Sequence, residues 1–298
     1  MDMPIILGDW GTTACRLHLV QKGRAVDGTS GPGIKFTDDP AKTYADMVAG
    51  WEAAHGPLPA LLCGTVGANI GWRDASYVTA PSAMADIVEA AISIPGRSVT
   101  ILPGVRTDAN AFGHTDVMRS EEIQVFGWLA SHDQSDALLC LPGSHTKWVE
   151  VENGTVQNLT TGFVGELFET LSDHSILTGP GEPPGTGEEF ARGVGIGATH
   201  AGFPSALFSV RAEAAQNRLE PQAARDRLSG ILIGADCAAM LRAWGCAPDA
   251  IIGGTGIATA YQTALKWLGH DVPVSDGDDA SLAGLIAAWQ TREENGRS

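Results

Sequence analysis

Residues 5–13 read Ile-Ile-Leu-Gly-Asp-Trp-Gly-Thr-Thr, a short apolar run followed by a carboxylate, a glycine and two threonines. Its apolar start, Ile5 to Leu7, predicts a short buried strand that ends at Gly8-Asp9. A second strand is predicted over Cys15 to Gln21, and a third begins near Ala25 after a tight turn. One carboxylate, one glycine and two hydroxyl residues therefore lie between the end of the first strand and the start of the second.

The same plan recurs later in the chain. Ala137 to Leu141 predict a buried strand, and residues 142–147 predict a turn of mostly small residues. Two further strands are expected over 148–151 and 155–159, and the pair Asn153-Gly154 between them is typical of a type I′ hairpin. Two such copies far apart in one chain indicate weak internal symmetry and two similar half-molecules.

Turns of this composition are suited to phosphate. Glycine lets the backbone approach a ligand closely and adopt positive φ. Successive N–H groups in such a turn form an anion-binding nest, and Ser or Thr hydroxyls add further donors. Either segment alone could equally be an ordinary glycine-rich hairpin, but the pair together favours phosphate binding.

A third segment, residues 250–256, reads Ala-Ile-Ile-Gly-Gly-Thr-Gly and precedes a helical stretch from about 257 to 268. A buried strand, a glycine turn and a helix N-terminus are a frequent nucleotide-binding arrangement. The chain has no G-x-x-x-x-G-K-[ST] run, and the first turn lacks the full G-x-G-x-x-G fingerprint. A Walker-type loop and a Rossmann dehydrogenase are therefore excluded.

Composition limits the partners. The chain has 298 residues, of which 44% are apolar and 18% charged, so it is expected to be a packed globular protein of two domains. Its net charge of -16 excludes general binding to nucleic acid or anionic lipid. No run reaches the roughly 18 apolar residues of a membrane helix, and the five cysteines lack C-x-x-C spacing. A soluble, cytoplasmic protein with buried free thiols is expected.

In this order the three segments resemble the phosphate 1, phosphate 2 and adenosine motifs of the actin, heat-shock chaperone and sugar-kinase superfamily. The middle one, Pro-Gly-Ser-His-Thr-Lys-Trp at 142–148, resembles the P-G-[TS]-H-[ST]-K-W signature of the 2-dehydro-3-deoxygalactonokinase family. Segments 102–108, 116–124, 161–168, 174–177 and 207–211 are similar to that family as well, so the resemblance runs from residue 5 to about 268. One departure is Ser120, where the family pattern has glycine, and another is the looser stretch Val164-Gly165.

The resemblance implies an α/β protein with the two-domain actin-like (ribonuclease H-like) fold. Each domain is then a mixed β-sheet flanked by helices, with ATP in the interdomain cleft; the domains are expected at 1–134 and 135–298. The implied reaction is ATP-dependent phosphorylation of 2-dehydro-3-deoxy-D-galactonate at the 6-hydroxyl, in galactonate breakdown, with Mg²⁺. The expected partners are this sugar acid and ATP, with a homodimer possible and no nucleic acid or membrane.

Roles in nucleotide binding follow from the motifs. Asp9, at a strand end before a glycine turn, is expected to hold Mg²⁺ through water; the alternative is an Asx turn that stabilises the hairpin. The ATP phosphates and nucleoside are expected to contact Gly11, Thr12, Thr13, Gly143, Ser144, His145, Thr146, Lys147, Gly253 and Gly254. Lys147 and His145 are also candidates for the sugar.

The general base is less well defined. Superfamily analogy places a catalytic acid between the two phosphate motifs and ranks Asp116 first, Glu121 second and Asp108 third. Asp116 could instead cap the helix expected over 120–130, and Glu121 and Glu122 suit its first turn through the helix dipole. The substrate carboxylate calls for a cation, and Arg16, Arg73, Arg106 and Arg119 are the candidates, with Asp108 beside them.

Other segments are helical or connecting. Residues 188–197, 205–245 and 280–291 show helical apolar spacing. The Gly/Pro-rich stretch 178–188 is read as a connector in preference to a mobile lid. Two other functions stay open: a phosphohydrolase of the same superfamily, permitted by the acids at 121–122, and an ATP-driven scaffold, chaperone or filament protein. A related sugar-acid kinase is the nearest alternative.

Overall fold

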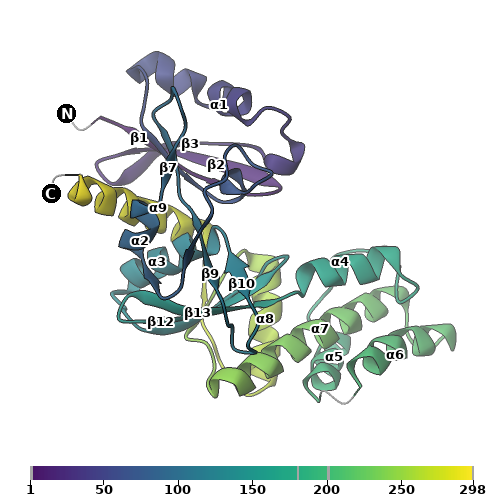
Figure 1. Ribbon diagram of the computed structural model, residues 1–298. Helices are drawn as coiled ribbons and strands as arrows, with labels where there is room; N and C mark the ends of the chain where they lie inside the picture. The colour runs from purple at the N-terminus through teal and green to yellow at the C-terminus, as the bar shows by residue number, and fades with distance from the viewer. Residues whose placement is uncertain (1–2, 180, 200–201, 297–298) are drawn as a thin grey trace. The chain divides into compact units, whose positions relative to one another are not determined.

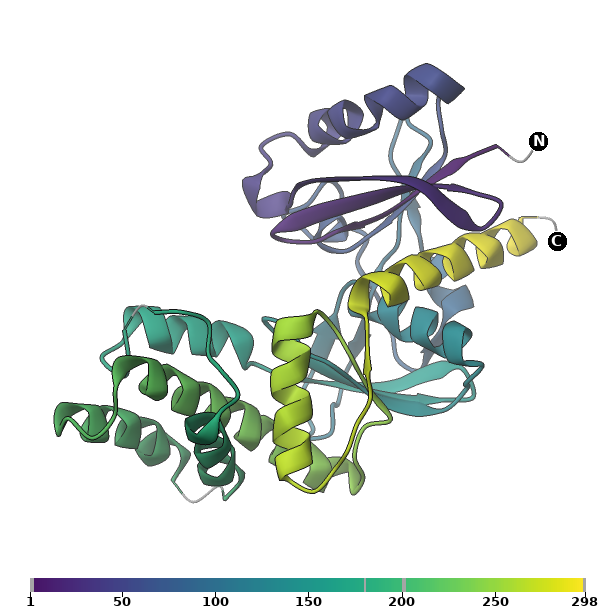
Figure 2. The same cartoon turned by 180° about the vertical axis from the view of Figure 1, so that it is seen from behind.

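The computed structural model describes residues 3–179, 181–199 and 202–296. Within them the chain forms two compact units (Figures 1 and 2). Unit 1 takes its residues from the ranges 1–136, 150–159 and 277–298, and unit 2 from 137–149 and 160–276. The chain passes between the units four times: between residues 136 and 137, within the strands β12 (Thr146–Glu152) and β13 (Thr155–Gly162), and just before the last helix.

Unit 1 contains the following helices and strands: β1 (Ile5–Trp10), β2 (Ala14–Gln21), β3 (Arg24–Pro32), α1 (Pro40–His55), β4 (Ala60–Cys63), β5 (Tyr77–Thr79), β6 (Ser82–Ala83), α2 (Met84–Glu89), β7 (Ile92–Ser93), β8 (Val99–Ile101), β9 (Gly104–Thr107), β10 (Asp116–Met118), α3 (Glu121–His132) and α9 (Gly277–Asn295). Short 3-10 turns lie at Ile34–Phe36 and Thr65–Gly67.

The main sheet of unit 1 is mixed, with strand order β3-β2-β1-β4-β8-β7. β1 pairs antiparallel with β2 and parallel with β4, so its carboxyl end meets the end of β4 at one edge of the sheet. A separate three-stranded sheet has the order β10-β9-β5. Helix α1 covers one face of the main sheet and α9 the other, as both views show. Buried side chains such as Ile6, Leu17 and Leu62 form the core of the unit.

Helices α3 and α9 cross closely because each carries a glycine at the crossing. A Cβ at Gly127 of α3 would overlap the backbone at Ala280, and one at Gly284 of α9 would overlap the carbonyl oxygen of Ile123. The absence of side chains here brings the two backbones into direct contact. The last helix of the chain is thereby fixed to a helix that lies far before it in the sequence.

Unit 2 contains the following elements besides its parts of β12 and β13: β11 (Ala137–Leu141), α4 (Gly165–His174), α5 (Glu188–Ala198), α6 (Phe203–Ala215), α7 (Pro221–Trp244), β14 (Ala250–Ile252), α8 (Thr255–Trp267) and β15 (Val274–Ser275). β14 pairs in parallel with β11 and with β15. Helices α4, α5, α6 and α8 all pack on α7, the long helix of the unit (Figure 1).

The crossing of α5 and α7 is lined by glycine from both helices. A Cβ at Gly193 or Gly197 would overlap the backbone of α7, and a Cβ at Gly230 or Gly234 would overlap the backbone of α5. Beside it, the buried guanidinium of Arg227 on α7 is paired with Glu189 and Glu213. Because an unpaired buried charge is costly, both carboxylates are needed to keep this arginine inside.

The structure confirms most of the predicted elements. The strands expected around the three glycine turns are β1, β2 and β3, then β11, β12 and β13, then β14, and helix α8 follows the third turn. Asn153 and Gly154 both have positive φ, as the predicted type I′ turn requires. The region 205–245 is two helices, α6 and α7, and the predicted final helix extends to 277–295.

All five cysteines are free thiols, and four are buried, but Cys246 is exposed because it follows the end of α7. No helix in the described part of the chain combines the length and apolar character needed to cross a membrane.

Candidate active site

Asp9 lies near the end of β1, where hydroxyl groups converge on its carboxylate. Ser120 Oγ donates a hydrogen bond of 2.7 Å to Oδ1, and Ser281 Oγ lies 3.5 Å from Oδ2. On the neighbouring strands, Arg16 is its register partner in β2. Gly64, just after β4, is at φ 96°, and a Cβ there would come within 2.8 Å of Oδ1. Only glycine fits this close approach.

Burial and neighbours act in opposite directions on this carboxyl. Burial raises the pKa of Asp9, while the hydrogen bond from Ser120 and the charge of Arg16 lower it. Arg16 also forms an ion pair with a second carboxylate, because its Nε lies 3.4 Å from Asp278 Oδ2. A cation beside Asp9 would favour the charged carboxylate, so the site is electrostatically suited to a metal ion.

The described residues contain no group of three or more His, Cys, Asp or Glu side chains that could hold a metal ion by themselves. Asp9 with hydroxyl neighbours fits an ion that takes most of its ligands from water and phosphate, as Mg²⁺ does.

In the turn after β1 the threonine hydroxyls are exposed, whereas the backbone carbonyls accept hydrogen bonds. Thr12 Oγ1 lies 3.0 Å from Thr65 Oγ1, and both Thr12 and Thr13 are exposed. The backbone N–H groups of Lys35 and Gly33 donate to the carbonyls of Thr12 and Thr13, and Gly11 closes the turn by donating to Ala14. The hydroxyls are thus held at the surface by a fixed backbone.

The segment that follows β10 joins Asp9 to helix α3. Ser120 is the N-cap position of α3 and has φ 94°, a left-handed conformation that costs a non-glycine residue about 1–3 kcal/mol. Glu121 Oε2 accepts from the Arg119 N–H at 2.9 Å, and Glu122 Oε1 accepts from the Ser120 N–H at 3.0 Å. Both glutamates therefore satisfy backbone donors at the start of the helix.

Glu122 is fully buried, and burial raises the pKa of its carboxyl to about 8. The negative charge of Glu121 raises the pKa of Glu122 further. The hydrogen bonds that Glu122 accepts from backbone N–H groups and the charge of Arg119 lower it. Glu122 is accordingly mostly protonated at neutral pH.

We expect Glu122→Gln to remove a pH dependence from the stability of the protein. Between pH 4.5, the ordinary pKa, and about 8, the unfolded carboxyl has lost a proton that the folded one keeps. This group therefore lowers the free energy of unfolding as pH rises, by up to about 1.4 kcal/mol per pH unit. The variant, measured by urea unfolding across this range, should gain stability relative to wild type as pH rises. Glu89→Gln, at an exposed position of α2, is the control; a pH-independent difference for Glu122→Gln would contradict the assignment.

The three-stranded sheet brings together three of the predicted polar residues. Arg106 on β9 donates from Nε to Thr79 Oγ1 at 2.8 Å, and its Nη1 lies 4.0 Å from Asp108 Oδ1. Asp116 lies on β10, where its Oδ2 accepts from Asn110 Nδ2 at 3.0 Å. Asp116 is therefore not the cap of α3, and that alternative is wrong.

The other arginines are held in different ways. Arg119 lies over the Tyr77 ring at 4.3 Å from its centroid, and Nη2 donates to the Ser76 carbonyl at 2.7 Å. Its Nε and Nη1 are buried without a hydrogen-bond partner. Arg73 donates to the Ser93 carbonyl at 2.6 Å, away from the three-stranded sheet. Of the four candidate arginines, Arg119 thus has buried N–H donors that no protein acceptor satisfies.

In unit 2, the phosphate 2 turn divides into an exposed and a buried half. Gly143 is partly accessible, and Ser144 and His145 are exposed. His145 Nε2 lies 2.6 Å from Glu166 Oε2, and its ring stacks on Phe163. Thr146 and Lys147 are buried. The side chains at the start of the turn are therefore the ones that face solvent.

A buried polar network lies behind this turn. Asp236 Oδ2, on α7, lies 3.0 Å from Trp148 Nε1 and 2.9 Å from the Tyr261 hydroxyl, which is 2.8 Å from Thr146 Oγ1. Burial raises the pKa of Asp236 to about 6, although both donors lower it. The network ties the buried half of the turn to two helices, α7 and α8.

A cavity of about 340 Å³ lies within unit 2 beside the exposed half of the turn. Its polar lining comes from Gly143 and Ser144 of the turn and from Glu169 and Ser229 of the helices. Helices α4, α7 and α8 also contribute the apolar residues Phe168, Leu232, Ile233, Ile257 and Ala260. Gly253 and Gly254 precede α8, and Gly256 in its first turn lines the cavity. Its volume and apolar lining are typical of a small-molecule site.

Comparison with known proteins identifies the family. Residues 9–288 match the model of the 2-keto-3-deoxy-galactonokinase family. The chain belongs to this family. Within it, the chain is 34% identical over 300 residues to a Rhizobium meliloti (strain 1021) protein named "Probable 2-dehydro-3-deoxygalactonokinase DgoK1", with 94% of both chains covered. It is 32% identical over 287 residues to the 2-dehydro-3-deoxygalactonokinase of Escherichia coli (strain K12), covering 93% of this chain and 94% of that one.

Solved structures agree with this family membership. A crystal structure of a candidate 2-dehydro-3-deoxygalactonokinase from Sinorhizobium meliloti has a TM-score of 0.87 and 33% identity, covering 96% of this chain and 98% of that one. The activator of the 2-hydroxyisocaproyl-CoA dehydratase from Clostridium difficile, with bound ADPNP, has a TM-score of 0.54 at 10% identity, with 99% and 97% covered, which concerns the fold alone. The predicted family and the two-domain actin-like fold are confirmed.

Several residues of this galactonokinase-family site were missed by the sequence analysis. Glu166 and Asp236 lie in helices and meet His145 and Trp148 only through the fold. The signal for Asp236 was a single acid within an otherwise apolar helix face. Ser281 comes from the last helix, and no local pattern links it to Asp9.

Proposed function

We propose that this protein transfers the γ-phosphoryl group of ATP to the 6-hydroxyl of 2-dehydro-3-deoxy-D-galactonate, a step in galactonate catabolism. Two relatives that share about a third of its sequence over nearly the full length carry the name of this kinase. The observation that carries the proposal is the cavity of unit 2, in which Gly143 and Ser144 lie beside an apolar space of about 340 Å³. Phosphate donors next to such a space fit a nucleotide.

Nucleotide contacts are assigned from the exposed groups. In unit 2, Gly143, Ser144 and His145 would donate to phosphate oxygens, and the first turn of α8 after Gly253 and Gly254 would border the nucleoside. In unit 1, Gly11, Thr12 and Thr13 would contribute the other phosphate contacts. Asp9 would hold Mg²⁺ through water; a bound Mg²⁺ neutralises charge on the phosphates. Thr146 and Lys147 stay candidates for the phosphates, and their burial favours support of the turn from behind.

The sugar acid is assigned to the polar side chains around β9 and β10. Arg106 and Arg119 are the favoured cations for its carboxylate, with Asp108 near Arg106, because bidentate arginine recognises a carboxylate best. The buried donors of Arg119 support its choice. Arg16 and Arg73 stay weaker candidates, since Arg16 lies beside Asp9 and Arg73 binds a carbonyl.

The transfer requires one proton acceptor. The 6-hydroxyl oxygen forms the new bond to the γ-phosphorus, the bond to the β-phosphate oxygen breaks, and the hydroxyl proton passes to a carboxylate. We propose Asp116 for this role, with Glu121 second. The choice is supported by the position of Asp116 on the sheet that carries Arg106. Each of the two acids accepts a backbone N–H, Glu121 from Arg119 just before α3 and Asp116 from Val117, so these bonds do not distinguish them.

Asp116→Asn is expected to abolish turnover while leaving ATP affinity within about twofold of wild type, because the amide keeps the shape but accepts no proton. Steady-state rates and an ATP titration of the same preparation measure both quantities. Asn110→Ala removes the hydrogen bond to Asp116 and the acceptor for the Phe112 and His114 N–H groups but keeps the carboxylate, so this comparison variant should retain part of the activity. Near-normal turnover of Asp116→Asn would remove Asp116 from the role and leave Glu121.

Release of ADP tests the function itself. Purified protein with MgATP is assayed alone, with 2-dehydro-3-deoxy-D-galactonate, and with the gluconate epimer. The proposal predicts turnover that requires the galactonate derivative. ATP hydrolysis indifferent to either sugar acid would favour a phosphohydrolase, and no hydrolysis would favour a scaffold. A cytoplasmic location and a homodimer remain predictions, which fractionation and light scattering can test.

A further inference from the structure

One wall of the unit 2 cavity is a loop with no secondary structure of its own. Residues 181–187 form neither helix nor strand, and Pro183 and Pro184 of this loop line the same cavity as the phosphate 2 turn residues Gly143 and Ser144. Proline rings supply an apolar surface and lack an N–H group. The sequence alone favoured a simple connector for 178–188, of which residue 180 lies outside the described residues. Since the loop lines a cavity, the contacts that fix its backbone also determine the shape of that cavity.

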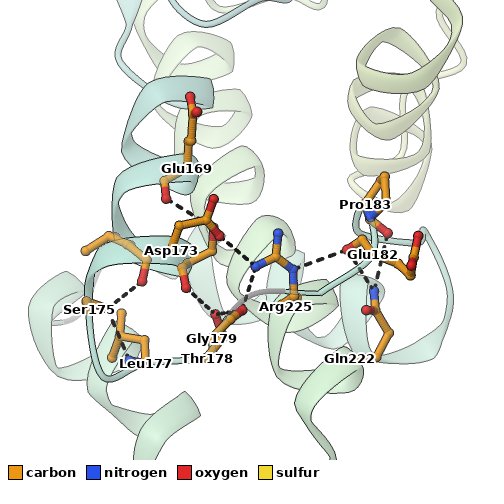
Figure 3. Close-up of polar contacts among 12 residues, drawn as sticks. Glu169, Asp173, Ser175, Leu177, Thr178, Gly179, Glu182, Pro183, Gln222 and Arg225 are labelled. Atoms are coloured by element: carbon orange, nitrogen blue, oxygen red, sulfur yellow. Dashed lines mark hydrogen bonds and ion pairs between the residues drawn. The ribbon is translucent and has the colours of Figure 1, made fainter.

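Arg225 on α7 binds the loop backbone through hydrogen bonds. Its Nη1 donates to the Gly179 carbonyl at 2.6 Å and to Asp173 Oδ1 at 3.1 Å, and its Nε donates to the Glu182 carbonyl at 3.2 Å. Figure 3 shows the guanidinium with Asp173 and Gly179 on one side and Glu182 on the other. The hydrogen bond from Arg225 lowers the pKa of the Asp173 carboxyl. One guanidinium thus joins the end of α4 to the backbone at the start of the loop.

Two further residues of α7 bind the next part of the loop. Gln222 Nε2 lies 3.3 Å from the Pro183 carbonyl and 3.5 Å from the Glu182 carbonyl (Figure 3). Asp226 Oδ1 accepts from the Gly185 N–H at 2.8 Å. Positions 222, 225 and 226 share one helix face. This face therefore binds the loop backbone on both sides of Pro184.

The position of Arg225 distinguishes it from a surface charge. The residue is only 7% exposed, its guanidinium lies 5.4 Å from the ring centroid of Phe168, and Phe168 lines the cavity as well. A Cβ at Gly181 would come within 2.8 Å of Arg225 Cδ, so glycine is needed where the loop crosses the side chain. Arg225 consequently supports two parts of the cavity lining, the Phe168 ring and the proline wall.

We infer that Arg225 is a positioning residue for the nucleoside: it fixes the proline wall so that the cavity accepts a flat heteroaromatic base. The inference rests on the proposed function, because it takes the cavity as the nucleotide site. Arginine is required by the geometry, since its planar fork reaches three acceptors at once and a lysine ammonium does not. Arg225 touches loop backbone and Asp173, not the reacting atoms, so its effect should fall on nucleotide binding.

The test compares Arg225→Gln and Arg225→Lys with wild type. Adenosine, which lacks phosphate, is the binding probe, and ATP and the sugar acid are the substrates. We expect the Kd for adenosine and the KM for MgATP to rise at least about tenfold in both variants. The kcat and the KM for the sugar acid should stay within about twofold of wild type. Arg218→Gln, at an exposed position near the end of α6, should match wild type throughout.

The outcomes separate the inference from the function. Folded variants that bind adenosine as wild type does would overturn the inference alone, and so would a parallel loss of kcat and of both affinities, which marks general destabilisation. Wild-type protein that binds neither adenosine nor ATP would overturn the proposed function and the inference with it. If Arg225→Gln fails to fold, Gln222→Ala removes two of the loop contacts at an exposed position and should raise the adenosine Kd about threefold.

Discussion

Replacing Asp9 by asparagine is expected to lower kcat by about 10³-fold or more. The amide keeps the size of the side chain and still accepts the hydrogen bond from Ser120. It loses the negative charge, which is the property that a cation at this position requires. The loss should therefore appear in the rate at saturating substrates, and added Mg²⁺ should not restore it.

The binding of adenosine provides a second measurement on Asp9→Asn. Asp9 belongs to unit 1, and all residues that line the cavity belong to unit 2, so the adenosine Kd should stay unchanged. Asp133→Asn makes the same chemical change at an exposed position with a left-handed backbone that asparagine also tolerates, and it should behave as wild type. A kcat for Asp9→Asn within tenfold of wild type would refute the metal role.

Gly234→Val is expected to destabilise unit 2 by about 3 kcal/mol or more. A Cβ at this position would overlap the backbone of Val194, so the close crossing of α5 and α7 cannot accept a side chain without separating the helices. Because the two helices carry much of the core of the unit, the loss should appear as a lower unfolding temperature. At about 2–4 °C per kcal/mol, the shift is readily measured by calorimetry.

The matched control for this substitution is Gly50→Val. Gly50 lies within α1, is exposed, and has no atom near the position of an added Cβ. Valine has a slightly better helix propensity than glycine, so this variant should be neutral or slightly more stable. Equal effects of the two substitutions would show that the crossing tolerates a side chain and would contradict the packing described for α5 and α7.

Local sequence was sufficient for the elements around the glycine turns. Ile5 to Leu7 and Ala137 to Leu141 are short apolar runs bounded by turn residues, and each is a buried strand in the structure. Asn153-Gly154 has a backbone that few other pairs adopt. In these segments the pattern of apolar residues and the turn chemistry act over a few positions, so the sequence carries the information directly.

Packing between distant segments was not predictable in the same way. Residues 277–296 belong to unit 1 together with residues 3–136, and Ser281 Oγ lies 3.5 Å from Asp9 Oδ2. The two domains predicted from the sequence, 1–134 and 135–298, are each one continuous segment, whereas unit 1 also includes the last helix of the chain. Gly127 and Gly284 allow it, but each looks like an ordinary helix glycine until its neighbour is known.

The site residues also divide into those that local sequence identifies and those that depend on contacts between distant segments. Asp9 was recognisable because the motif and the strand end coincide, whereas Asp236 and Glu166 gain their roles only from partners on other elements. The sequence resemblance predicts glycine at position 120, and the φ of 94° at Ser120 is a backbone conformation that favours glycine. In this chain the serine hydroxyl is used to bind Asp9.

Phosphoryl transfer to the sugar acid can be tested by identifying the product of the reaction. Protein, MgATP and 2-dehydro-3-deoxy-D-galactonate are incubated, and the sugar acid is analysed by mass spectrometry and by ³¹P–¹H correlation. We expect one new phosphate on the oxygen at C6, formed in equal amount to ADP. ADP with inorganic phosphate and unchanged sugar acid, or a phosphate on another oxygen, would contradict the claim.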